Sequence, residues 1–192
     1  IMDNNLSQNR YGINLAGSSD EEVTGNLALS NLMQGIKVTD SVNMSLKENQ
    51  LHKNQYALLI TDSQSIEAYS NNASLNDLGM AFQHCRRCTV KENTISKNSN
   101  GLVLAGSSQC ILSFNRILNN RLEGLALGSS HDNLIQENQL QGNYDGVYMD
   151  NSINNSVKGN RASDNIDHGI LLFNNSSGTT LAENRLATTG GG

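Results

Sequence analysis

Asparagine recurs along this chain at nearly constant spacing, and that spacing restricts the possible folds more than any other feature. One series steps through the chain at intervals of 22 to 24 residues: Asn4, Asn26, Asn49, Asn71, Asn93, Asn115, Asn138, Asn160 and Asn184. A second series follows the first by five positions in eight repeats: Asn9, Asn31, Asn54, Asn76, Asn98, Asn120, Asn143 and Asn165. A fixed period of this length is typical of proteins in which similar units stack on one another.

Other positions keep the same period. Glycine follows the second asparagine by three or four residues in seven repeats, and Ala57 takes its place in the remaining one. A small polar residue lies six positions after the glycine, usually serine, with Cys85 and Asn175 as the exceptions. Between them lies an apolar pair spaced i, i+2: Ile13/Leu15, Ile36/Val38, Leu58/Ile60, Met80/Phe82, Leu102/Leu104, Leu125/Leu127, Val147/Met149 and Ile170/Leu172. A spacing of two residues is the period of a β-strand.

Each repeat therefore contains short strand-like stretches separated by Asn, Gly and Ser, which accept turn conformations. We predict an all-β fold, a right-handed single-stranded parallel β-helix of about eight coils with three short strands per coil. Successive coils would stack about 4.8 Å apart, so equivalent asparagines would form hydrogen-bonded ladders at two corners. A leucine-rich repeat has a similar length, but its helical half and its dense leucine pattern are missing.

The composition fits a thin core and excludes several classes of protein. Only 36% of the residues are hydrophobic and eight are aromatic, which favours a narrow column of Leu, Ile and Val. The net charge of −5 argues against nucleic-acid binding, which needs a basic surface. No apolar run is long enough to span a membrane. We expect residues 1–192 to form a single domain, a piece of a longer protein whose uncapped ends permit end-to-end self-association.

The segments Asn93–Asn98 and Gly101–Leu104 read NTISKN and GLVL. They resemble the parallel β-helix repeats shared by carbohydrate-binding proteins, sugar hydrolases, NosD-type periplasmic copper-maturation proteins and mannuronan epimerases. This resemblance implies a periplasmic, secreted or cell-surface protein with a polysaccharide lying along one β-face. It carries over no catalytic motif, because the epimerase Asp-Pro-His needs a proline and the polygalacturonase site needs an Asp-Asp pair, and both are absent. Enzymatic activity is left open, and we favour a non-catalytic role for this chain alone.

Two groups of side chains are candidates for ligand binding. Asp40, Asp62 and His84 each lie five residues after the glycine position, so they should sit on consecutive coils roughly 5 Å apart, with Lys37 nearby. Two carboxylates this close can divide acid and base roles, can form a retaining glycosidase pair, or can bind calcium weakly. The alternative is that all three are solvated turn residues.

The second group is Tyr148 with Asp150, followed one coil later by Asp167, His168 and Phe173. An aromatic ring beside carboxylates suits a sugar, because the ring covers C–H groups while the acids bind hydroxyls. An ordinary surface tyrosine is the alternative reading.

The three cysteines are Cys85, Cys88 and, one coil later, Cys110. Cys88 and Cys110 share a column with Met44 and Ile66, so we predict buried thiols. A disulfide between Cys88 and Cys110 and a copper or zinc site are the alternatives, but the strong zinc signature needs a second pair of ligands. We predict no metal site and no cofactor, and weak calcium binding at the aspartates is left open.

Three functional classes are therefore open. The first is an extracytoplasmic polysaccharide-binding module or the scaffold of a carbohydrate-active enzyme. The second is a NosD-like periplasmic component that docks a protein partner during copper-centre maturation, and the third is a structural surface solenoid. We favour the first, because an aromatic side chain lies beside acids on a predicted exposed strip.

Overall fold

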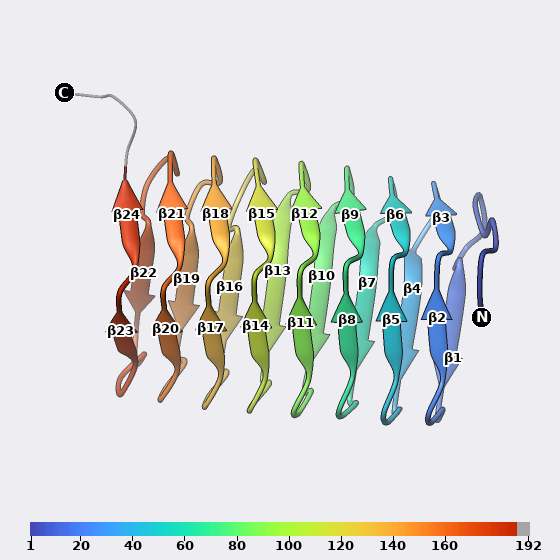
Figure 1. Cartoon of the computed structure of the whole chain (residues 1–192), viewed down its shortest axis with the longest axis horizontal. Coiled ribbons are helices and arrows are strands. Elements are labelled where there is room, and N and C mark those ends of the chain that lie inside the picture. Colours follow the sequence, from blue (N-terminus) through green and yellow to red (C-terminus); the bar gives the residue numbers. More distant parts are fainter. Residues whose placement is uncertain (188–192) are drawn as a thin grey trace.

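The computed structural model describes residues 1–187 as a parallel β-helix of eight coils (Figure 1). Each coil contributes one strand to each of three sheets, and every neighbouring pair of strands is parallel and lies one coil apart. The fold prediction is thus confirmed, including three strands per coil. The last five residues of the predicted domain, 188–192, lie outside the described residues.

Sheet 1 contains the longest strands, of four to six residues. Its members are β1 (Ile13–Ala16), β4 (Gln34–Thr39), β7 (Tyr56–Thr61), β10 (Leu78–Gln83), β13 (Asn100–Ala105), β16 (Leu125–Gly128), β19 (Val147–Asp150) and β22 (Ile170–Phe173).

Sheets 2 and 3 are built from strands of three residues. Sheet 2 contains β2 (Glu22–Thr24), β5 (Ser45–Lys47), β8 (Glu67–Tyr69), β11 (Thr89–Lys91), β14 (Ile111–Ser113), β17 (Leu134–Gln136), β20 (Ser156–Lys158) and β23 (Thr180–Ala182). Sheet 3 contains β3 (Leu27–Leu29), β6 (Gln50–His52), β9 (Asn72–Ser74), β12 (Thr94–Ser96), β15 (Arg116–Leu118), β18 (Gln139–Gln141), β21 (Arg161–Ser163) and β24 (Arg185–Ala187).

The core is the predicted thin column of aliphatic side chains. In coil 5, for example, Leu102, Leu104, Leu112 and Ile117 point inward from the three sheets and have no exposed surface. The glycine column has a steric cause, because a Cβ atom on Gly79 would lie 2.5 Å from the carbonyl oxygen of Gly101 on the next coil. Residues 1–187 contain no helix of the length and apolarity that crossing a bilayer requires.

Side-chain ladders run along the corners, as predicted for asparagine. At the corner between sheets 2 and 3, for example, the backbone N–H and the Nδ2 of Asn93 both donate to Oδ1 of Asn115, at 3.0 Å each. The corner between sheets 3 and 1 has the same arrangement, in which Asn98 donates to Asn120 at 3.0 and 3.1 Å. Because each amide is both donor and acceptor, the pattern continues from coil to coil without charge repulsion.

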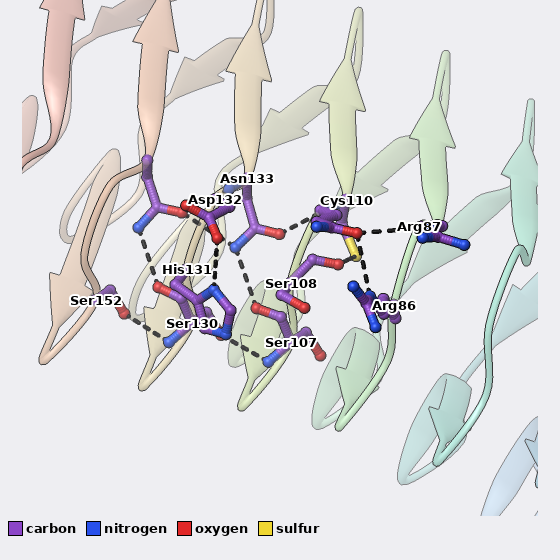
Figure 2. A network of polar contacts seen from close by, with 12 residues as sticks. Arg86, Arg87, Ser107, Ser108, Cys110, Ser130, His131, Asp132, Asn133 and Ser152 are labelled. Atoms are coloured by element: carbon purple, nitrogen blue, oxygen red, sulfur yellow. Dashed lines mark hydrogen bonds and ion pairs between the residues drawn. The ribbon is translucent and has the colours of Figure 1, made fainter.

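The third corner, between sheets 1 and 2, has a serine ladder, of which Ser107, Ser130 and Ser152 are visible in Figure 2. Each serine hydroxyl accepts from the backbone N–H of the previous coil, for example Ser107 N to Ser130 Oγ at 3.1 Å. The spacing predicts that Asn175 takes the serine position on the last coil, and this prediction is wrong. Ser176 occupies the position and accepts from Ser152 N, because the last repeat is longer.

The buried cysteine column changes character along the stack. Cys88 and Cys110 lie in it as predicted and are free thiols, as is Cys85 in the serine ladder, and each is 1% exposed. Beyond Cys110 the column continues with asparagine, and Asn133 accepts the backbone N–H of Cys110 at 2.9 Å (Figure 2).

Candidate functional site

The first predicted group lies in a groove at the corner between sheets 1 and 2. Asp40, Asp62 and His84 are on coils 2, 3 and 4, and each backbone is left-handed, with φ of 49°, 49° and 52°. This conformation turns the chain around the corner. The shallow groove has a volume of about 470 Å³ and is lined by Asp40, Ser41, Val42, Asp62, Ser63, Gln64, His84 and Arg86. The structure therefore brings these three predicted residues together. Lys37 is on the outer face of sheet 1 and does not line the groove.

The His84 side chain lies against residues of both neighbouring coils. Its Nδ1 lies 3.4 Å from Oδ1 of Asp62, and both side chains are more than half exposed. On the other side its ring occupies the space above Gly106, where an added Cβ atom would lie 2.8 Å from Cδ2 of His84. Exposed pairs of this kind contribute little to stability. The groove offers carboxylate oxygens and an imidazole to a ligand, which suits the hydroxyl groups of a sugar.

Three residues of the second predicted group, Tyr148, Asp150 and Phe173, lie on the outer face of sheet 1, whereas Asp167 and His168 lie in the loop between β21 and β22. The rings of Tyr148 on coil 7 and Phe173 on coil 8 stack with centroids 6.4 Å apart and an angle of 30° between their planes. Asp150 lies beside Phe173 and accepts a hydrogen bond from Asn174. Partial burial raises the pKa of the Tyr148 phenol, and the negative charges of Asp150 and Glu123 add smaller contributions in the same direction. The phenol therefore stays protonated and can donate to a ligand.

The outer face of sheet 1 between the two groups, called the floor here, carries mostly small side chains. On coils 4 to 6 the outward positions of sheet 1 are Ala81 and Gln83, Val103 and Ala105, and Ala126 and Gly128, and Ala81 has no exposed surface. Tyr148 follows Ala126 directly in register, and Asp150 follows Gly128. His84 and Tyr148 are three coils apart, about 14 Å at the usual strand spacing. The two groups are therefore not one compact site, although an extended ligand along the stack would reach both.

A buried aspartate that the sequence analysis missed organises the second region. The side chain of Asp145 is 6% exposed, and its Oδ1 accepts both the backbone N–H of His168 at 3.0 Å and Nδ1 of His168 at 2.9 Å. Asp167 Oδ2 lies 3.4 Å from the same Nδ1. One ligand atom from each of these three residues falls within 4.8 Å of the other two.

This cluster had a signal in the sequence. The residues immediately before the glycine position are Asn100, Glu123, Asp145 and His168 on consecutive coils, and the backbone bonds Gly124 N to Asp145 O and Gly146 N to His168 O keep them in register. The negative charge of Asp167, together with burial, also raises the pKa of the nearby Tyr144 phenol.

A third group, also missed, lies at the corner between sheets 1 and 2 (Figure 2). Arg86 and Arg87 are consecutive exposed residues of coil 4, and Nε of each donates to Oε1 of Gln109 on coil 5, at 3.1 and 3.4 Å. Further along the stack, Nδ1 of His131 lies 2.9 Å from Oδ2 of Asp132.

The cysteines offer soft sulfur donors but no open site. A hydrogen bond with Cys110 lowers the pKa of Cys88, but a hydrogen bond with Cys85 and burial outweigh it and raise the pKa to about 12. A hydrogen bond with Cys88, together with burial, also raises the pKa of Cys110. The thiols of Cys88 and Cys110 are therefore protonated at neutral pH, and all three thiols are enclosed in the core.

Comparison with known proteins gives a family and a fold. The sequence matches the family described as periplasmic copper-binding protein (NosD) over residues 1–82 and 59–189. No curated protein matches the chain.

Three solved structures illustrate the fold similarity. The periplasmic alginate epimerase AlgG has a TM-score of 0.86 and 22% identity over 96% of this chain and 49% of its own. DFA-IIIase from Arthrobacter chlorophenolicus A6 has a TM-score of 0.74 and 15% identity over 90% of this chain and 49% of its own. The Dettilon tailspike protein has a TM-score of 0.66 and 13% identity over 83% of this chain and 44% of its own. This chain therefore spans at most about half the length of each of these proteins. At these low sequence identities, the similarity shows a shared fold.

Proposed function

The chain belongs to the family of periplasmic copper-binding proteins of the NosD type, and from this premise we propose that it is an extracytoplasmic module that binds a polysaccharide along the outer face of sheet 1. The observation that carries the proposal is the stacked pair Tyr148 and Phe173 beside Asp150, at the end of a floor of small side chains. Aromatic faces cover the C–H surfaces of sugars, and the neighbouring carboxylate accepts hydrogen bonds from hydroxyls.

The length of the surface supports a polymer rather than a single sugar. The groove with Asp40, Asp62 and His84 lies along the same stack, so one extended chain would contact both the groove and the ring pair. The fold neighbours include an alginate epimerase and a DFA-IIIase, both named for carbohydrate substrates. These names support the proposal only through the shared fold.

A binding screen against neutral and acidic polysaccharides tests this proposal. It is run with and without calcium, because Asp40 and Asp62 line one groove. We expect Tyr148→Ala and Phe173→Ala to weaken binding about tenfold or more, in line with an aromatic contact of more than about 1 kcal/mol. The matched control is Tyr69→Ala, whose ring lies on sheet 2. Calcium-dependent binding that is lost in Asp40→Ala and Asp62→Ala would place a cation in the groove.

If no glycan binds, the proposal is wrong, and docking of a protein partner or a structural solenoid becomes the better account. Equal losses in Tyr148→Ala and Tyr69→Ala would also contradict it, since they would show that the ring pair has no special role.

Copper binding is a second candidate function, because the family description names copper. The thiols suit Cu(I) by their softness, but they are enclosed in the core. The cluster of Asp145, Asp167 and His168 supplies carboxylate oxygens and an imidazole near the surface, a donor set that Cu(II) accepts. Copper titration followed by electron paramagnetic resonance tests this. Nitrogen coupling that disappears in His168→Gln would support the site, and an unchanged spectrum would exclude it.

A further inference from the structure

Two neighbouring arginines share one neutral acceptor at the corner between sheets 1 and 2. Arg86 and Arg87 both direct Nε at Oε1 of Gln109. No other hydrogen bond from either side chain occurs within residues 1–187. Since a guanidinium has five N–H donors, four remain on each arginine for a ligand.

No arginine within residues 1–187 forms an ion pair, and Arg86 and Arg87 differ from the others because these two cations share one neutral acceptor. The chain has 18 acidic and 13 basic residues, and lysines elsewhere pair with carboxylates across coils, such as Lys47 with Glu22 and Lys158 with Glu183. In the described part of the chain, no ion pair involves Arg86 or Arg87. Two cations that share a single oxygen repel each other. An anion between their free edges would attract both and offset that repulsion.

The geometry of the ligand follows from the side chains. A guanidinium is planar and presents a fork of donors that matches a carboxylate, sulfate or phosphate group with two parallel hydrogen bonds. Gln109 accepts from the Nε atom of both guanidinium groups and so brings them together. Gln109 is therefore a positioning residue, and the two arginines are the contact residues.

The location of the pair connects the anion to a polysaccharide. Arg86 lines the groove that also contains Asp40, Asp62 and His84. One end of this groove is therefore acidic and the other end is basic. Sugar hydroxyls suit the two aspartates, and an acidic substituent suits the arginines. We infer that Arg86 and Arg87, held by Gln109, bind the carboxylate or sulfate groups of an acidic polysaccharide. This inference rests on the proposed function and names its ligand class.

The test compares pairs of polymers that share a backbone and differ in whether that backbone carries an anionic group. Polygalacturonate and its methyl ester share a backbone, as do dextran sulfate and dextran, so the two pairs separate carboxylate from sulfate. Binding to the whole chain is measured by calorimetry at low salt. We expect at least one acidic polymer to bind about tenfold or more tightly than its neutral counterpart, and this preference to fall as salt rises from about 0.05 to about 0.5 M.

Three variants locate the effect. Arg86→Gln with Arg87→Gln should abolish the preference, whereas the charge-matched control Arg116→Gln with Arg161→Gln on sheet 3 should retain it. Gln109→Glu keeps the shape but places a carboxylate between the arginines, so it should abolish the preference without removing either cation. All these side chains belong to exposed residues, so melting temperatures should stay unchanged.

The outcomes separate this inference from the proposed function. If acidic and neutral polymers bind equally and Tyr148→Ala weakens both, the glycan surface stands and the arginine site is refuted. A preference that survives both Gln109→Glu and the double arginine variant refutes it as well. If polyglutamate binds to the arginines more tightly than any glycan, the assignment to a polysaccharide is wrong. Absence of binding to every polymer overturns the proposed function and this inference together.

Discussion

Removal of one ladder asparagine in the middle of the stack tests the physical basis of the fold. Asn98 is 3% exposed, and its side chain takes part in four hydrogen bonds. Its Oδ1 accepts from the backbone N–H of Asn76 at 2.9 Å and from Nδ2 of Asn76 at 3.0 Å. Its Nδ2 donates to the carbonyl of Ala73 and to Oδ1 of Asn120, both at 3.1 Å.

Asn98→Ala removes all four bonds, but the partners are affected unequally. Oδ1 of Asn120 keeps the backbone N–H of residue 98, and Nδ2 of Asn76 keeps the carbonyl of Leu51. The backbone N–H of Asn76 is left buried without its acceptor. At about 1 kcal/mol per bond, with a further penalty for the buried orphan group and the small void, we expect a loss of about 3–5 kcal/mol.

The assay is urea unfolding followed by circular dichroism, with the midpoint compared at constant slope. Asn14→Ala is the control, because Asn14 is an exposed residue of sheet 1 whose side chain makes no ladder bond, and we expect a change below about 0.5 kcal/mol. Asn98→Asp is a stricter variant, since it keeps the shape but replaces two donors with an acceptor. It should destabilise at least as much as alanine at neutral pH. Equal midpoints for Asn98→Ala and Asn14→Ala would refute the ladder argument.

Three other substitutions or treatments probe the core and its ionisable groups. Leu104→Asp places a charge in the fully buried column and should lower the melting temperature far more than Lys37→Ala on the outer face; similar values would contradict the assigned register. Burial lowers the pKa of His52, so the folded state favours the neutral ring, and stability present above the unfolded value of 6.5 should be lost as the pH falls through it. In His52→Gln the melting temperature should depend less steeply on pH between about 7.5 and 5.5, and an unchanged slope would exclude this contribution. Because Cys88 is buried with a pKa of about 12, it should react with a thiol reagent at pH 8 only after denaturation, and rapid labelling of the native protein would show that the core opens.

The repeat made most of the fold predictable. In a β-helix each residue lies above its equivalent one coil away, so a column of like residues in the sequence becomes a column in space. This is why the two asparagine ladders, the inward leucines and the alignment of Asp40, Asp62 and His84 were predicted from spacing alone. The position of Ser176 was not, because the longer final repeat shifted the register by one residue.

What the sequence determined by itself was therefore the stacking of the backbone and the choice of inward and outward positions, since both follow from a period of two within strands and of about 22 between coils. What only the tertiary structure decided was the direction of polar side chains at the corners. Asp145 turns inward to hold His168, and Arg86 and Arg87 converge on Gln109. These contacts depend on side-chain rotamers in the corner turns, which periodicity does not constrain, and they define the chemistry of the surface.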